Sequence, residues 1–172
     1  MLDLETFGTR HDALIVQIGA CYFDRETGAI GETFEATIEY KEDIDKFSVD
    51  YSTLKWWLEQ TRHAQDSVVG RSVTSCNLPT ALVQLNRFLE RGPVMVWSHA
   101  TFDMPILMNA YATLAYTFSV PYRNMRDLRT LMELYGEKAQ IEREGVHHHA
   151  LDDAKYQARY ASIAMQKLNG RS

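Results

Sequence analysis

The sequence has little of what builds disulfide-linked or membrane-spanning proteins. Its 172 residues include only two cysteines, Cys21 and Cys76, and their spacing does not resemble a metal site. Two isolated cysteines in a chain of this length argue against a disulfide scaffold and are typical of buried thiols, so we expect a reducing, cytoplasmic location. No apolar run approaches the ~20 residues that span a bilayer, and we expect no secretory signal and no membrane association.

Excess positive charge and linker segments are also absent. The net charge of -5 gives no long-range attraction for a polyanion, which argues against a protein that coats nucleic acid. It leaves open an enzyme that meets phosphate through bound divalent cations, because the cations supply the local positive charge. No Pro/Gly/Ser-rich stretch or repeat divides the chain, so we predict a single domain over residues 1–172.

The residue pattern predicts strands first and helices later. Apolar and alternating runs indicate strands over residues 13–23, 33–40 and 94–98, with a turn between the first two. Helical spacing and its stop signals indicate five helices, over residues 51–65, 79–90, 105–114, 124–135 and 150–168. This order predicts an α/β or α+β layered domain in which helices cover a sheet.

Two carboxylates open the chain at strand spacing. Asp3 and Glu5 are two residues apart, so on a strand both side chains point to the same face. Neighbouring like charges repel, and a cation between them would remove the repulsion. An exposed strand with two solvated charges would show the same alternation, so this pair alone does not decide between the two interpretations.

Three further acidic residues stand where helices begin. Asp103 lies between the strand over 94–98 and Pro105, a position that suits a helix N-cap as well as a site residue. Asp152 and Asp153 open the last helix, directly after three histidines, and periodicity does not separate these two aspartates. His148 and Asp153 are five residues apart, so they meet only if His148 lies in the loop before the helix.

The order of these residues resembles the DEDDh exonucleases, a family with the ribonuclease H-like fold. The first family motif, D-x-E, is similar to Asp3-Leu4-Glu5, and the second ends in Phe102-Asp103. The third, H-x-A-x-x-D, is similar to residues 148–153 and selects His148 and Asp153 over their neighbours. The segment over residues 53–60 resembles phage and bacterial members akin to phage T4 exonuclease A and exodeoxyribonuclease VIII-like proteins.

The resemblance implies a ribonuclease H-like mixed sheet flanked by helices, and a metal-dependent 3′→5′ exonuclease that releases nucleoside 5′-monophosphates. It implies two Mg²⁺ or Mn²⁺ ions, a single-stranded 3′ end of DNA or RNA as substrate, and a possible homodimer. The phage-type likeness favours DNA slightly. The alternatives are an exoribonuclease or oligoribonuclease, a non-catalytic nucleic-acid-binding module, and a zinc-binding regulatory protein that uses the histidines. The implied metal ligands are Asp3, Glu5, Asp103 and Asp153, and the implied general base is His148.

The terminal nucleotide needs a pocket of its own. Thr6, Phe7 and Gly8 follow the first motif and are candidates to line it, with Phe7 either stacking on a base or packing in the core. We add Phe102 and Trp57 as candidate substrate-binding residues. Because Trp56 and Trp57 are adjacent on a predicted helix, their side chains diverge by ~100°, and we expect at most one to be deeply buried.

Overall fold

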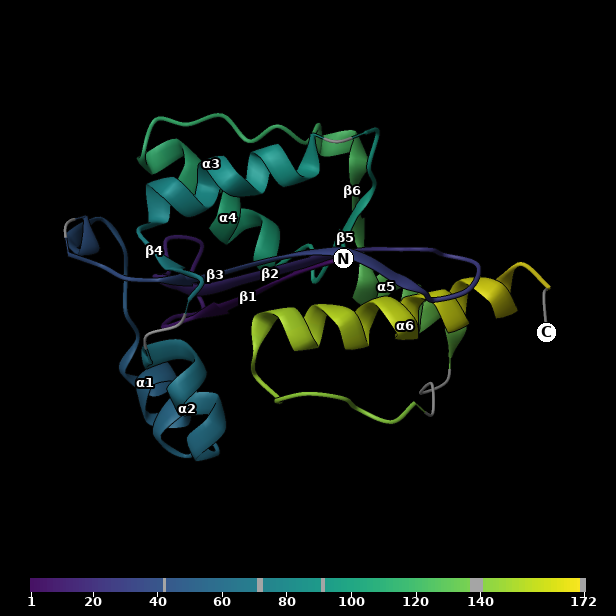
Figure 1. Ribbon diagram of the computed structural model, residues 1–172, viewed down its shortest axis with the longest axis horizontal. Helices are drawn as coiled ribbons and strands as arrows, with labels where there is room; N and C mark the ends of the chain where they lie inside the picture. Colours follow the sequence, from purple (N-terminus) through teal and green to yellow (C-terminus); the bar gives the residue numbers. More distant parts are fainter. Residues whose placement is uncertain (42, 71–72, 91, 137–140, 171–172) are drawn as a thin grey trace.

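The computed structural model describes residues 1–41, 43–70, 73–90, 92–136 and 141–170. A four-stranded mixed sheet crosses the molecule (Figure 1). Its strands, in their spatial order, are β1 (Leu2–Thr6), β2 (Ile15–Phe23), β3 (Ile30–Ile38) and β4 (Ser75–Cys76). The first two pairings are antiparallel and the last is parallel. A second sheet consists of two parallel strands, β5 (Val96–Ser98) and β6 (Met125–Asp127). Its strand β5 lies beside β1.

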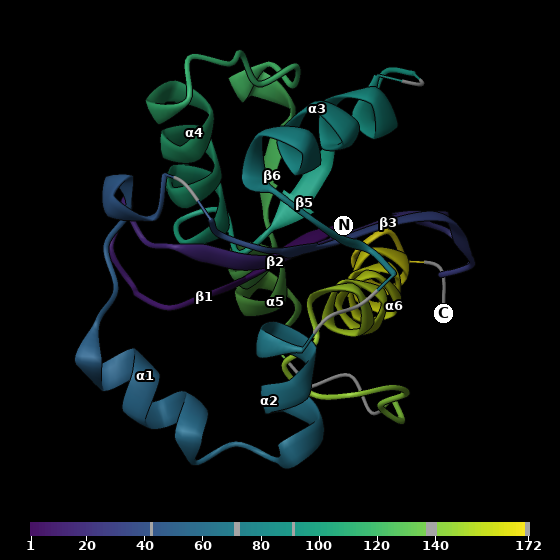
Figure 2. The same cartoon turned by 60° about the vertical axis from the view of Figure 1, so that its left-hand side comes forward.

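Helices cover both faces of the sheet, which confirms the predicted α/β layering (Figures 1 and 2). On one side lie α3 (Leu78–Leu89) and α4 (Asp103–Thr113). On the other lie α1 (Tyr51–Leu58), α2 (Arg62–Val69), α5 (Leu128–Tyr135) and α6 (Ala150–Leu168). Two short 3-10 helices, η1 (Ile44–Lys46) and η2 (Tyr122–Asn124), lie in the connections. Among the described residues, no helix is long and apolar enough to cross a membrane.

Strand β1 separates an apolar side from an acidic side. Leu2 and Leu4 are buried in one cluster with Leu82 of α3 and Leu107 of α4. Because side chains alternate along a strand, Asp3 and Glu5 point to the opposite face, where α6 packs against β1. Burial of the two leucines therefore fixes the direction in which the carboxylates point.

The start of α6 rests directly on strand β2. A Cβ on Gly19 would lie 2.2 Å from the carbonyl carbon of Ala150, so only glycine permits this approach. The Ala150 N–H, the first helical amide, donates to Gln17 Oε1 at 2.8 Å. Because Gly19 pairs with Asp3 across the β1–β2 ladder, the first turn of α6 is held over Asp3.

Two predicted helices were wrong in part. The helix predicted over residues 51–65 is broken after Leu58, and Thr61 begins a new one by accepting the Ala64 N–H at its Oγ1. The helix predicted from residue 124 begins only at Leu128. The residues Met125–Asp127 form strand β6 instead, and Asp127 caps the helix that follows. The remaining predicted elements are confirmed, with boundaries shifted by up to three residues.

Candidate active site

Three carboxylates from the two ends of the chain meet beside β1. Asp3 and Glu5 on β1 and Asp153 on α6 each offer an oxygen, and these oxygens lie within 4.8 Å of one another. All three residues are buried. Asp103 joins the same cluster, because its carboxylate lies within 4.8 Å of that of Asp3 in a second group that includes His99. The structure thus brings together the four acidic residues that the sequence singled out.

Asp103 reaches the cluster from the start of α4. It is the first residue of that helix, and Phe102 occupies the N-cap position, so the N-cap alternative for Asp103 is wrong. Its Oδ2 accepts the backbone N–H of His99 at 2.8 Å, which turns the carboxylate back toward β5. The helix predicted over residues 105–114 therefore starts two residues too late, because proline at 105 is a signal for a first helical turn.

Burial makes ionisation of this cluster unfavourable. It raises the pKa of Asp3 to about 7, although the hydrogen bond from Gln157 opposes the increase. Burial raises the pKa of Glu5 to about 9, and the nearby Asp3, Asp153 and Asp103 add to the increase. The pKa of Asp103 is also raised, first by burial and then by Asp3. Cations among these groups would favour the charged forms.

The donor chemistry of the cluster fits hard divalent cations. Carboxylate oxygens are the ligands that Mg²⁺ and Mn²⁺ prefer. Gln157 Nε2 donates to Asp3 Oδ1 at 2.7 Å, while Gln157 Oε1 is buried without a hydrogen-bond partner among the described residues. An unsatisfied acceptor beside buried carboxylates suits a water molecule held by a cation. The residues therefore fit the two Mg²⁺ or Mn²⁺ ions that the family resemblance implies.

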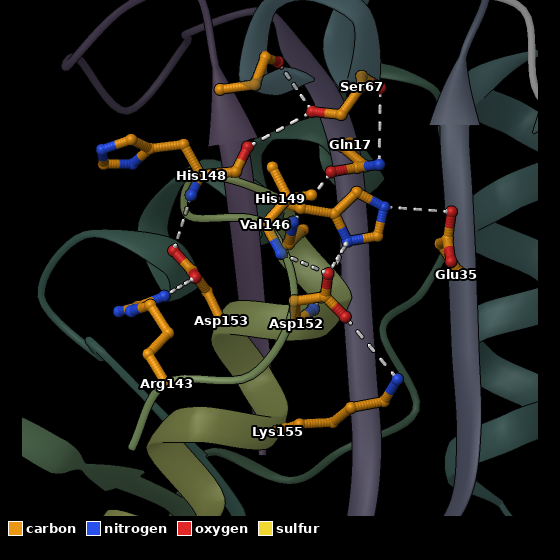
Figure 3. A network of polar contacts seen from close by, with 12 residues as sticks. Gln17, Glu35, Ser67, Arg143, Val146, His148, His149, Asp152, Asp153 and Lys155 are labelled. Atoms are coloured by element: carbon orange, nitrogen blue, oxygen red, sulfur yellow. Dashed lines mark hydrogen bonds and ion pairs between the residues drawn. The ribbon is translucent and has the colours of Figure 1, made fainter. Parts of the chain in front are cut away.

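His148 lies in the loop before α6, as its meeting with Asp153 requires. Its φ of +64° bends the chain there, and its N–H donates to Asp153 Oδ2 at 3.3 Å (Figure 3). Its carbonyl accepts from Ser67 Oγ on α2, also at 3.3 Å. Burial, with His147 nearby, lowers the pKa of His148 despite the opposing charge of Asp153. A neutral imidazole, which can accept a proton, is thus favoured at pH 7.

The other neighbours of His148 and Asp153 face away from the cluster. The ring of His149 points opposite to that of His148 and lies 3.5 Å from Glu35 and from Asp152 (Figure 3). Asp152 Oδ2 accepts the Val146 N–H at 2.9 Å, so Asp152 fastens the loop that carries His148. Asp153, and not Asp152, therefore joins the buried carboxylates, in agreement with the motif.

A cavity of about 790 Å³ opens over the carboxylates. Four of the five candidate substrate-binding residues line it, namely Thr6, Gly8, Phe102 and Trp57. Phe7 does not line it. Strand pairing shifts register after Glu5, and the Phe7 side chain packs against the core and edge-on to Trp57. The structure thus favours core packing over base stacking for Phe7.

The two adjacent tryptophans divide as expected. Trp57 is buried, and its Nε1 donates to the Thr6 carbonyl at 2.9 Å, so it supports the backbone after the first motif. Trp56 is 39% exposed, and its ring centroid lies 4.7 Å from that of His148. The more accessible aromatic surface beside the site thus belongs to Trp56 and not to the predicted Trp57.

Sequence reasoning also missed Arg143 and Gln157. The Arg143 guanidinium pairs with Asp153 and lies 4.2 Å from the Tyr156 ring centroid. It comes from irregular backbone, for which no periodic signal exists. Gln157, by contrast, is four residues after Asp153 on a helix, and that spacing places both on one face. The spacing was a usable signal for Gln157.

The fold and the site together define a 3′→5′ exonuclease of the DEDDh type, a hydrolase. The family described as "3′-5′ exoribonuclease Rv2179c-like domain" matches residues 1–165. The chain belongs to this family. A comparison with curated proteins found no match.

Solved structures share the fold at low sequence identity. The nuclease domain of 3′hExo, a DEDDh family member bound to rAMP, matches with a TM-score of 0.59 at 16% identity, over 96% of this chain and 90% of that one. A 3′-exonuclease described by its 3′-end-specific recognition of a histone mRNA stem-loop matches with the same score and identity, over 96% and 80%. A full-length 3′-exonuclease matches with a TM-score of 0.55 at 16% identity, over 98% and 80%.

Proposed function

We propose that this protein is a two-metal exoribonuclease that removes nucleoside 5′-monophosphates from the 3′ end of single-stranded RNA. The observation that carries the proposal is the meeting of Asp3, Glu5, Asp103 and Asp153 in one buried cluster next to His148. Four carboxylates are costly to bury together unless cations share them. A large cavity over such a cluster leaves room for a nucleotide.

The carboxylates would hold two divalent ions. Asp3 belongs to two ligand groups, one with Glu5 and Asp153 and one with His99 and Asp103, so it would contribute to holding both ions. Glu5 and Asp153 complete one group, and Asp103 completes the other. Bound Mg²⁺ or Mn²⁺ supplies charge neutralisation at the scissile phosphate and at the leaving 3′ oxygen.

His148 would act as the general base. Its lowered pKa keeps the imidazole neutral at physiological pH, so it can accept a proton from the attacking water. The His148 N–H contact to Asp153 and the Ser67 contact to its carbonyl hold the backbone of this residue in place. The water attacks the phosphorus, and the bond to the 3′ oxygen of the preceding nucleotide breaks.

Selection of a chain end would come from the wall of the cavity. The backbone over Thr6–Gly8 is fixed, because Thr6 Oγ1 donates to the Gly8 carbonyl at 2.7 Å and Trp57 donates to the Thr6 carbonyl. This segment lines the cavity next to Glu5, so it is placed to contact a terminal 3′ hydroxyl. Phe102 and the partly exposed Trp56 offer apolar surface for bases, worth ~1–3 kcal/mol for each stacked base.

RNA is favoured over DNA by the comparisons and not by the site. The matching family is described as exoribonuclease. The descriptions of two structural relatives name RNA ligands, rAMP for one and a histone mRNA stem-loop for the other. The slight preference for DNA that we expected from the sequence has no such support. It rested on the likeness of residues 53–60 to phage T4 exonuclease A and exodeoxyribonuclease VIII-like proteins, and that narrower kinship stays a prediction.

Matched oligonucleotides test the substrate. Single-stranded RNA and DNA of the same sequence, each with a 5′ label, are incubated separately with the protein and Mg²⁺. We expect faster shortening of RNA, nucleoside 5′-monophosphate as the product, and protection by a 3′-terminal phosphate. Faster shortening of DNA would reject the choice of RNA and leave the exonuclease mechanism intact. Cleavage inside a 3′-blocked chain would reject the exonuclease proposal itself.

A further inference from the structure

The histidine run does not act as one unit in the fold. His149 turns to Glu35 and Asp152, whereas His147 and His148 stay together on the side of the cavity. The ring centroids of His147 and His148 lie 3.8 Å apart. The proposed function uses His148 alone, so His147 remains without a role although it is exposed at the cavity wall.

His147, His148 and Asp153 form another ligand group, which shares only Asp153 with the all-carboxylate one. Each offers one nitrogen or oxygen, and these three atoms lie within 4.8 Å of one another. Two imidazoles and one carboxylate are a ligand set typical of Zn²⁺, which Mg²⁺ does not prefer. The two imidazole rings are stacked, and His147 is exposed, so its side chain can adjust its direction toward a shared ion without disturbing the core.

We propose that His147, His148 and Asp153 bind a zinc-class divalent ion, and that this ion inhibits the enzyme. Zinc at this site occupies His148 and draws Asp153 away from Asp3 and Glu5. It also competes with the guanidinium of Arg143 for Asp153. The binding part stands on the geometry of the three residues, whereas inhibition rests on the proposed function.

Zinc binding is measured first, without substrate. The full chain is titrated with Zn²⁺ by calorimetry in excess Mg²⁺, and in parallel with Co²⁺ followed by visible absorption. We expect one zinc equivalent to bind, and a cobalt spectrum of four-coordinate geometry with nitrogen ligands. His147→Gln should weaken zinc binding by about tenfold or more, because losing a direct ligand costs at least as much as losing a residue that orients one. His147→Cys should restore it, because cysteine is a zinc ligand.

The control is His63→Gln, which removes an exposed histidine of α2 outside the ligand group. It should bind zinc as the unchanged protein does. Zinc binding that is equally tight in His147→Gln would overturn the proposal, as would the absence of zinc binding in excess Mg²⁺.

Inhibition is then measured on an RNA oligonucleotide with Mg²⁺. With each protein compared with its own activity without zinc, we expect His147→Gln to need about tenfold more Zn²⁺ for half-inhibition. Equal zinc sensitivity in both proteins would overturn the inhibitory role. If zinc binds as expected but no variant degrades nucleic acid, the proposed function fails while the zinc site stands, so the two failures are distinguishable.

Discussion

At the residue scale, Asp153 is the point where several interactions converge. Its carboxylate lies with those of Asp3 and Glu5, accepts the His148 N–H, and pairs with the Arg143 guanidinium. A cation that binds the carboxylates must therefore compete with Arg143 for this residue. The Arg143 guanidinium also contacts the Tyr156 ring. It can stay on this ring when Asp153 binds a cation in its place.

Replacing Arg143 by glutamine should tighten metal binding. The change removes the competing cation, and we expect roughly fivefold higher affinity for Mn²⁺, since a partly exposed ion pair contributes up to about 1 kcal/mol. Calorimetric titration with Mn²⁺ measures this. The matched control is Arg159→Gln, because Arg159 pairs with Glu144 instead. Unchanged or weaker Mn²⁺ affinity in Arg143→Gln would show that Arg143 does not compete for Asp153.

At the element scale, the site depends on how α6 is seated on β2. The helix begins where Gly19 admits the Ala150 backbone and where Gln17 accepts its first N–H. These contacts lie across the ladder from Asp3, so they set the separation of Asp3 and Asp153. The long apolar stripe of α6 was readable from the sequence, but this close approach was not, because one glycine in a strand has several explanations.

Gly19→Ala should therefore damage both stability and metal binding. The new methyl group meets backbone atoms, which cannot move aside as a flexible side chain can, and overpacking of this kind costs about 1–3 kcal/mol or more. Urea denaturation measures the free energy of unfolding, and Mn²⁺ titration measures the site. Gly31→Ala on β3 is the matched control, because its nearest contact would be an ordinary 3.5 Å. Equal stability of the two variants would contradict this view of the α6 contact.

The limits of sequence reading also lie at the element scale. Most strands and helices were predicted because alternation and helical periodicity report burial directly. The break between α1 and α2 was missed, because Glu59 and Gln60 are good helix formers and only the Thr61 cap marks the new start. Strand β6 was missed because its three residues are too few to show a period.

At the scale of the whole molecule, the fold gathers carboxylates from the first strand, the middle of the chain and the last helix. Strand geometry alone predicted that Asp3 and Glu5 share a face. The approach of Asp103 and Asp153 followed only from the family resemblance, because no local pattern reports contacts between distant segments. Arg143 was outside both kinds of reasoning, since its role arises from tertiary packing. For the tryptophans, helix geometry predicted that at most one is deeply buried, but not that Trp56 is the exposed one.

The buried carboxylates should make stability of the metal-free protein fall as pH rises. Asp3 and Glu5 have ordinary pKa values of 3.8 and 4.5, and in the folded protein these are raised to about 7 and about 9. In the unfolded chain they lose protons at lower pH than in the folded state, so their contribution to stability declines between about pH 4 and pH 9.

Melting temperatures in a chelator, measured across this pH range, test the expectation. Glu5→Gln should reduce the decline, because it removes the group with the higher pKa, and Mn²⁺ should stabilise the unchanged protein most at the alkaline end. The same pH dependence in Glu5→Gln and in the unchanged protein would show that Glu5 does not cause the decline.

Metal-dependent shortening of a 5′-labelled RNA is the most direct test of the whole account. With Mg²⁺ we expect a ladder of products that shorten from the 3′ end, and with a chelator no products. Asp153→Asn should be inactive, while Asp152→Asn, which alters contacts to Val146, His149 and Lys155 outside the carboxylate cluster, should keep most of the activity. Shortening that persists in chelator, or equal loss of activity in the two variants, would contradict the assignment of Asp153 to a carboxylate site that holds the catalytic ions.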